Sequence, residues 1–244
     1  MTRVALVTGA ARGIGAEIAG RLAADGFAVA LADLDPPEHR TAELTAKHDV
    51  AARAYRLDVR DLAACRSVVA AVTADLGGLD LLVNNAGINA RGDTVAMPEE
   101  TWLSVLDTNL NGTYRMSVAA HAALKRSRGA VVNLASTAGQ IAVKGSAAYA
   151  VSKAGIIHLT RILALEWAAD QIRVNAVGPT IVPTDMTTDV RQDPAYMAGK
   201  LASIPLGRMV ETADVAEAVA WLASPAARLV TGQTLFVDGG ATVV

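Results

Sequence analysis

The stretch AAYAVSKAG, residues 147–155, places Tyr149 four residues before Lys153 in a chain with only four tyrosines. Side chains four residues apart lie on the same face of a helix, so the two are neighbours if the stretch is helical. An ammonium group favours the phenolate form of a nearby phenol and lowers its pKa from about 10, which makes the phenol usable as an acid or base near neutral pH. The pair is therefore a candidate proton donor, although Tyr and Lys also fall at this spacing on helix surfaces that have no catalytic role.

A glycine-rich turn near the N-terminus indicates a second kind of chemistry. The stretch VTGAARGIGAEIA places Gly9, Gly13 and Gly15 between a predicted strand and a predicted helix. Glycines let the backbone approach a pyrophosphate at a helix N-terminus, where free N–H groups and the helix dipole favour an anion. The same turn could be only a tight connection, but its context favours dinucleotide binding by Gly9, Arg12, Gly13, Ile14 and Gly15.

The end of the second predicted strand bears on the choice of dinucleotide. The stretch VALADLD contains Asp33, eighteen residues after Gly15. An acidic side chain at this point accepts hydrogen bonds from the adenosine ribose hydroxyls and repels a 2′-phosphate. Asp33 therefore favours NAD over NADP, even though Arg12 could attract a phosphate.

These residues are positioned by a regular alternation of strands and helices. Short β-rich runs alternate with longer Ala-rich stretches, which is typical of a parallel sheet covered by helices. We predict an α/β fold with one Rossmann-like, doubly wound parallel sheet of about seven strands, helices on both faces, and a single domain over residues 1–244. Residues 179–205 carry four prolines and no firm period, which indicates a substrate lid or loop with short helices. The predicted strands are 3–8, 27–33, 52–59, 79–85, 129–136, 172–178 and 232–240, and the predicted helices are 14–24, one ending near residue 48, 62–76, 97–126, 149–169 and 213–223.

Composition excludes several classes of protein. Apolar residues make up 52% of the chain but form only short blocks, whereas a membrane span needs about 18 in a row. With no signal peptide visible, we expect a cytoplasmic protein. A net charge of −2 without basic blocks argues against nucleic-acid binding. His39, His48, His121 and His158 lack metal-ligand spacing, so no metal site is predicted, and Cys65 is assigned no role.

With the glycine turn and the YAVSK stretch both present, the sequence resembles the short-chain dehydrogenase/reductase family along essentially its whole length. TGAARGIG resembles the cofactor turn of the family. LDV, with Asp58 and Val59, resembles the strand end that contacts adenine. NNAG, which contains Asn85, Ala86 and Gly87, resembles the motif that backs the cofactor.

The resemblance also implies a complete catalytic set. Asn109 in TNLNGTY matches the helix asparagine of the family's active site. Ser136 in NLASTAG lies thirteen residues before Tyr149, where the family's catalytic serine is expected. The resemblance implies that Tyr149 acts as general base in alcohol oxidation and general acid in ketone reduction, with its pKa lowered by Lys153 and the oxidised nicotinamide. Ser136 would hold the substrate oxygen, Lys153 would also bind the nicotinamide ribose, and Asn109 would steady a proton-carrying water chain.

One segment departs from the family pattern. The family usually has Pro-Gly after the sixth strand, whereas here Pro179 is followed by Thr180. The change removes backbone freedom and adds a hydroxyl near the expected nicotinamide carboxamide. We expect cofactor contacts from Pro179, Val182 and Thr184, with Thr180 the altered position.

Three functions compete on these residues. The first is an NAD-dependent oxidoreductase that interconverts a secondary alcohol and its ketone. Its substrate could be a polyol or sugar alcohol, because polar contacts to a hydroxylated substrate could come from Gln140, Asn89, Lys144 and Thr180. The second is an NADPH-dependent ketone or 3-oxoacyl-(acyl carrier protein) reductase, which Asp33 disfavours. The third, a catalytically silent nucleotide-binding scaffold, has no need of the complete catalytic set. The resemblance further implies a homotetramer, with contacts through the two long central helices and the apolar C-terminal tail.

Overall fold

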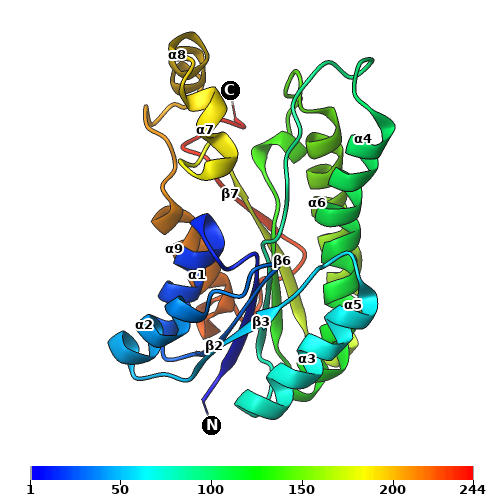
Figure 1. Cartoon of the computed structure of the whole chain (residues 1–244), viewed down its shortest axis with the longest axis vertical. Helices are drawn as coiled ribbons and strands as arrows, with labels where there is room; N and C mark the ends of the chain where they lie inside the picture. Colours follow the sequence, from blue (N-terminus) through cyan, green and yellow to red (C-terminus); the bar gives the residue numbers. More distant parts are fainter. Residues whose placement is uncertain (1, 244) are drawn as a thin grey trace.

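A computed structural model describes residues 2–243 and confirms the predicted single parallel sheet. Seven strands lie in the order β3-β2-β1-β4-β5-β6-β7, with helices on both faces (Figure 1). Among residues 2–243, no helix combines the length and apolar character that crossing a bilayer requires. The strands are β1 Val4–Thr8, β2 Ala28–Asp33, β3 Ala52–Arg56, β4 Leu81–Asn84, β5 Ala130–Leu134, β6 Arg173–Pro179 and β7 Thr234–Val237. The α-helices are α1 Gly13–Ala24, α2 Glu38–His48, α3 Leu62–Leu76, α4 Glu99–Leu106, α5 Gly112–Ser127, α6 Ala147–Glu166, α7 Thr188–Arg191, α8 Pro194–Ala202 and α9 Thr212–Ala223.

The central strands are apolar on both faces because each face is covered. Along β1, Val4 and Leu6 belong to the core cluster that contains side chains of α3, α5 and α6. Ala5 and Val7 point the other way, into the cluster formed with α1 and α9. Side chains alternate across a strand, so one continuous apolar run fills both layers of the core.

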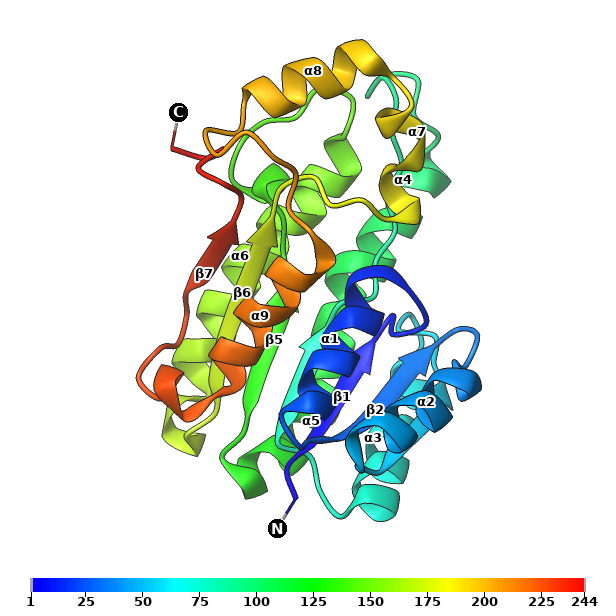
Figure 2. The ribbon, with the colours of Figure 1, turned by 90° about the vertical axis from the view of Figure 1, so that its left-hand side faces the viewer.

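The topology of the sheet predicts which of its ends binds ligands. The strand order reverses between β1 and β4, and ligands of such sheets bind beyond the carboxyl ends of the strands at this reversal. Figure 2 shows α7 and α8 above these strand ends, so residues 179–205 do contain the predicted short helices. Their action as a lid remains a prediction.

The predicted helix over residues 97–126 is wrong in one respect. It is divided by a π-helical segment, Asp107–Asn111, between α4 and α5. A π-helical turn contains an extra residue, which re-aims side chains and often marks a functional site. Here it places Asn109 in the interior, with none of its surface exposed to solvent. The predicted third strand is also too long, because β3 ends at Arg56 and leaves Asp58 and Val59 in the following loop.

Candidate active site

The glycine turn between β1 and α1 is held in place by Asn85. The Asn85 side-chain amide donates to the carbonyl oxygens of Thr8 and Gly9, both at 2.9 Å. A Cβ atom on Gly15 would lie 2.2 Å from the Gly9 oxygen and 2.4 Å from the Asn85 nitrogen. Only glycine allows this approach, so the turn and the segment after β4 form one unit.

The N-terminus of α1 is suited to an anion. In the described chain, Arg12 at the N-cap makes no side-chain capping bond, and the first turn of α1 contains no acidic residue. The first backbone N–H groups of a helix have no partner within it, and they attract phosphate. The residues present therefore fit a dinucleotide pyrophosphate at Gly13, Ile14 and Gly15. The Arg12 guanidinium forms an exposed ion pair with Asp185, at 2.8 Å.

Two carboxylates lie at the carboxyl ends of neighbouring strands, Asp33 as the last residue of β2 and Asp58 in the loop after β3. Asp33 accepts from the backbone nitrogens of Ala11, at 2.9 Å, and Leu34, at 2.8 Å, one with each oxygen. Each oxygen keeps a second lone pair for a ribose hydroxyl. Asp58 instead forms a salt bridge of 2.6 Å with Arg60, and this hydrogen-bonded pairing holds the pKa of its carboxyl below the usual range.

The segments after β4 and β6 complete the predicted cofactor site. The Thr8 hydroxyl accepts from the backbone nitrogens of Asn85 and Ala86, at 3.0 and 3.1 Å. A Cβ atom on Gly13 would lie 3.4 Å from the methyl group of Thr184, so the segment after β6 reaches the glycine turn. The structure thus brings together predicted cofactor residues from the segments after β1, β4 and β6. Their contact with a cofactor remains a prediction. Those after β4 and β6 are Asn85, Ala86, Gly87, Pro179, Thr180, Val182 and Thr184.

Ser136 is fixed by the loop after β5. Its hydroxyl accepts from the backbone nitrogen of Ala138 at 3.1 Å and donates weakly to the Pro179 oxygen at 3.5 Å. The same loop presses on α6, because a Cβ atom on Gly139 would lie 2.6 Å from the carbonyl carbon of Lys153. This close packing sets the position of Ser136 relative to the catalytic helix.

Tyr149 and Lys153 occupy successive turns of α6, as the spacing predicts. The Lys153 nitrogen lies 5.5 Å from the centre of the Tyr149 ring and donates to the Leu134 oxygen at 2.6 Å. Only 5% of Lys153 is exposed. The ammonium therefore sits behind the tyrosine ring, anchored to the end of β5.

Burial shifts the pKa values of both Tyr149 and Lys153. Burial raises the pKa of Tyr149, while the Ser136 hydroxyl and the positive charge of Arg91 act in the opposite direction. Burial is the largest of these effects in the protein alone, and the expected lowering of this pKa by Lys153 together with the oxidised nicotinamide remains a prediction. Burial also lowers the pKa of Lys153, from 10.5 to about 8. Tyr149 is thus a protonated phenol at neutral pH and is set to donate.

Asn109 connects the segment after β4 with the catalytic helix. Its side-chain oxygen accepts from the Ile88 nitrogen at 2.8 Å, and its amide donates to the Ile88 oxygen at 2.9 Å and the Ser152 hydroxyl at 3.0 Å. Ser152 in turn donates to the Tyr149 carbonyl oxygen at 2.7 Å. Both amide hydrogens are used, so Asn109 positions Tyr149 here, and its link to a water chain remains a prediction.

Three comparisons with known proteins agree with this geometry. A family model described as enoyl-(acyl carrier protein) reductase matches residues 9–242. The chain is 40% identical to the 3-oxoacyl-(acyl-carrier-protein) reductase FabG of Staphylococcus aureus over 244 residues, covering 98% of each chain. A short-chain type dehydrogenase/reductase from Mycobacterium ulcerans superimposes with a TM-score of 0.95 at 32% identity, over 99% of this chain and 90% of the other. The chain belongs to the short-chain dehydrogenase/reductase family. A second structure, a gluconate 5-dehydrogenase from Burkholderia cenocepacia in complex with NADP and tartrate, has a TM-score of 0.93 at 32% identity, over 99% of this chain and 96% of the other.

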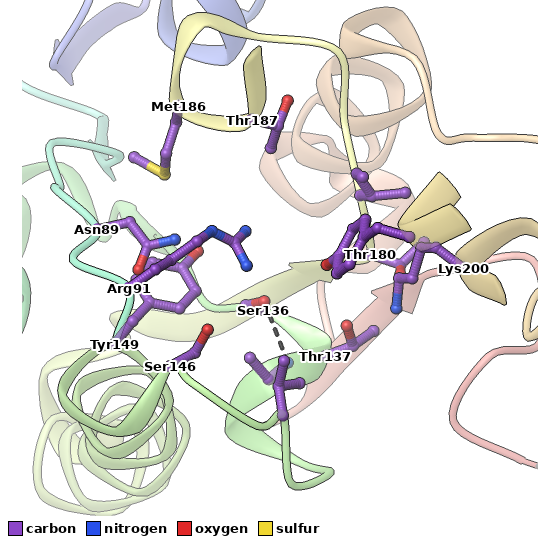
Figure 3. A pocket seen from close by; sticks show the side chains of 14 residues that line it. Asn89, Arg91, Ser136, Thr137, Ser146, Tyr149, Thr180, Met186, Thr187 and Lys200 are labelled. Carbon is purple, nitrogen blue, oxygen red and sulfur yellow. Dashed lines mark hydrogen bonds between the residues drawn. The ribbon is translucent and has the colours of Figure 1, made fainter. Parts of the chain in front are cut away.

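In this short-chain dehydrogenase/reductase, Ser136 and Tyr149 line one pocket together with residues that the sequence did not single out (Figure 3). The pocket also contains Asn89 and Thr180, as expected for polar substrate contacts. Gln140 and Lys144, expected there too, are exposed on the outer side of their loop and do not line it.

The pocket residues missed by sequence reasoning include Arg91, Ser146, Met186, Thr187, Tyr196 and Lys200. Arg91 lies four residues after Gly87, and Lys200 lies within residues 179–205. The sequence indicated residues 179–205 as a substrate lid or loop, but loop residues are polar for ordinary reasons and nothing in the spacing of Arg91 or Lys200 distinguished them.

Proposed function

We propose that this short-chain dehydrogenase/reductase interconverts a ketone and a secondary alcohol, with Tyr149 as the proton carrier. The observation that supports this most directly is the shared pocket of Ser136 and Tyr149, with the buried Lys153 behind the tyrosine ring. A hydroxyl and a phenol that open into one cavity can hold the same carbonyl oxygen. A nicotinamide cofactor, when bound, supplies the hydride.

At neutral pH the protonated Tyr149 is suited to act as the general acid in ketone reduction. Because burial raises its pKa, Tyr149 carries the proton that a ketone oxygen needs as it becomes an alcohol. Ser136 would orient that oxygen by donating a hydrogen bond, at the cost of its weak 3.5 Å bond to the Pro179 oxygen. Lys153 would hold positive charge beside the phenol and stabilise the phenolate left after transfer.

Similarity and sequence point to different substrates. The full-length relatives named as 3-oxoacyl-(acyl-carrier-protein) reductases favour a 3-oxoacyl substrate over the polyol or sugar alcohol first expected. The second candidate, a small hydroxylated substrate, is favoured by polar residues of the pocket such as Asn89 and Thr180.

Two observations bear on the choice between NAD and NADP, and they point in opposite directions. Asp33, at the ribose end of the predicted site, favours NAD, whereas a solved relative at 32% identity is in complex with NADP. We propose NAD as the preferred cofactor, because a carboxylate held at this position repels a 2′-phosphate.

Replacing Tyr149 by phenylalanine tests the mechanism. The change removes the titratable oxygen and leaves a ring of nearly the same shape, so folding should survive while kcat for ketone reduction falls by at least about 100-fold. Tyr55→Phe is the matched control, because it removes a phenol that bonds to Asp75 on the protein surface. Retention of the wild-type rate by a folded Tyr149→Phe protein would refute the proposal.

A further inference from the structure

The substrate pocket differs in charge from the rest of the molecule. The whole chain carries a net charge of −2, with 24 acidic and 22 basic residues. Within the described chain, the residues that line the pocket include two cations, Arg91 and Lys200, and no aspartate or glutamate. A cavity of uniform positive charge raises the local concentration of anions.

Arg91 reaches into this cavity without an acidic partner. Among residues 2–243 its guanidinium belongs to none of the eight ion pairs. Its guanidinium carbon lies over the Tyr196 ring, 6.0 Å from the ring centre. Figure 3 shows the guanidinium pointing into the middle of the cavity, beside Tyr149 and Asn89. Its charge also acts on the Tyr149 phenol, so the reacting end of a small substrate lies within its electrostatic reach.

Lys200 approaches from the opposite wall. It belongs to α8 and lies beside Thr180 in Figure 3. Burial lowers the pKa of Lys200, and the charge of Asp238 opposes this effect without forming a salt bridge within the described chain. Asp238 is instead bonded to Gly240 and Thr242, so it does not neutralise Lys200 directly.

A buried hydroxyl in the same pocket also lacks a partner. Thr180 is 8% exposed, and in the described part of the chain its side-chain oxygen makes no hydrogen bond. An unpaired buried hydroxyl destabilises the protein, and a polar ligand in the cavity would supply the missing hydrogen bond. This observation is independent of charge and indicates a polar ligand.

We propose that the substrate carries a carboxylate, bound by Arg91 with assistance from Lys200, so that the protein acts on a small oxo acid and the corresponding hydroxy acid. This inference rests on the ketone and alcohol chemistry proposed above and narrows its substrate. A planar guanidinium binds a carboxylate through two parallel hydrogen bonds, whereas a neutral acyl chain gives it no partner. The reaction reduces the ketone carbon by hydride from the nicotinamide and places the Tyr149 proton on its oxygen. The carboxylate remains unchanged.

The test compares each acid with its own methyl ester. Oxo acids with the ketone at carbons 2 to 5, and their methyl esters, are assayed as substrates with NADH and with NADPH for the wild type, Arg91→Met and Arg91→Lys. Methionine preserves most of the stem and removes the charge. The quantity measured is the acid-to-ester ratio of kcat/KM, which cancels any effect of Arg91 on the Tyr149 proton because that effect is common to both substrates.

We expect the wild type to prefer one acid over its ester by at least about 10-fold, and Arg91→Met to reduce that ratio by about 10- to 100-fold, chiefly through KM. Arg91→Lys should retain part of the wild-type acid-to-ester ratio, because it keeps a positive charge. Lys200→Met should reduce it less, and Arg66→Met, an exposed arginine on α3, should leave it unchanged.

Two results with the acids and esters would overturn the inference while leaving ketone reduction intact, and a third concerns a thioester substrate. One is an equal or greater kcat/KM for the esters, and the other is an acid-to-ester ratio that Arg91→Met does not change. Preference for a 3-oxoacyl thioester on acyl carrier protein, independent of Arg91, would also overturn it. If no carbonyl compound is reduced, the proposed function fails, and calorimetric titration with succinate and neutral succinamide decides the anion site separately. Binding of succinate alone that Arg91→Met abolishes supports it, and equal or absent binding refutes it.

Discussion

Replacing Lys153 by methionine separates the cost of burying its ammonium from its role in the site. Burial lowers the pKa of Lys153 from 10.5 to about 8. That difference corresponds to roughly 3 kcal/mol of folding free energy lost when the group is charged, at about 1.4 kcal/mol per pH unit. Methionine removes this cost but leaves the Leu134 oxygen without its 2.6 Å donor, which costs about 1–3 kcal/mol. At pH 7 the variant should therefore be as stable as the wild type or up to about 2 kcal/mol more stable.

The pH dependence gives the sharper test. Between pH 8 and 10.5 the unfolded chain keeps a proton on Lys153 that the folded chain has released, so this group makes the wild-type free energy of unfolding rise with pH. Lys153→Met lacks this rise. The stability difference, variant minus wild type, should fall by about 3 kcal/mol from pH 7 to pH 10.5.

Urea unfolding followed by circular dichroism at pH values from 7 to 10.5 measures that difference. Lys47→Met, which removes an exposed lysine on α2, is the control and should give a flat difference across the series. At the same time, Lys153→Met should lose ketone reduction and bind the cofactor more weakly, because the predicted ribose contact is lost. A difference that stays constant with pH would refute the assignment of a buried, easily deprotonated Lys153.

Two further predictions concern the cofactor preference and the oligomeric state. The kcat/KM of the wild type should be higher with NAD than with NADP. Asp33→Ala should reduce this ratio and also weaken NAD binding, since the carboxylate accepts from the Ala11 nitrogen and holds the glycine turn. Equal use of NADP by the wild type would contradict this prediction. Light scattering at micromolar concentration should give four times the mass of one chain, because α5 and α6 expose apolar side chains such as Tyr114, Val151 and Leu165, the last 78% exposed. Leu165→Glu should weaken that assembly, and a monomeric wild type would rule it out.

The elements that follow a regular period could be predicted closely from the sequence. The helix expected over residues 62–76 has these bounds in the structure, since Asp61 caps its N-terminus and Gly77 ends it in a left-handed conformation. The π-helical segment could not be predicted, because its cause is tertiary. The Asn109 side chain bonds to Ile88 and Ser152, which are distant in sequence, and no local pattern records these partners.

The substrate pocket was harder to predict for a related reason. Ser136, Tyr149 and Lys153 stand at fixed distances from strand and helix ends, so their spacing carries information that a single sequence retains. Arg91 and Lys200 lie on separate loop and lid segments, and their meaning comes only from facing the same cavity. The chemistry of the reaction was therefore predictable from residue types and spacing, whereas the charge that would select the substrate emerges only when segments after β4 and β6 are folded against each other.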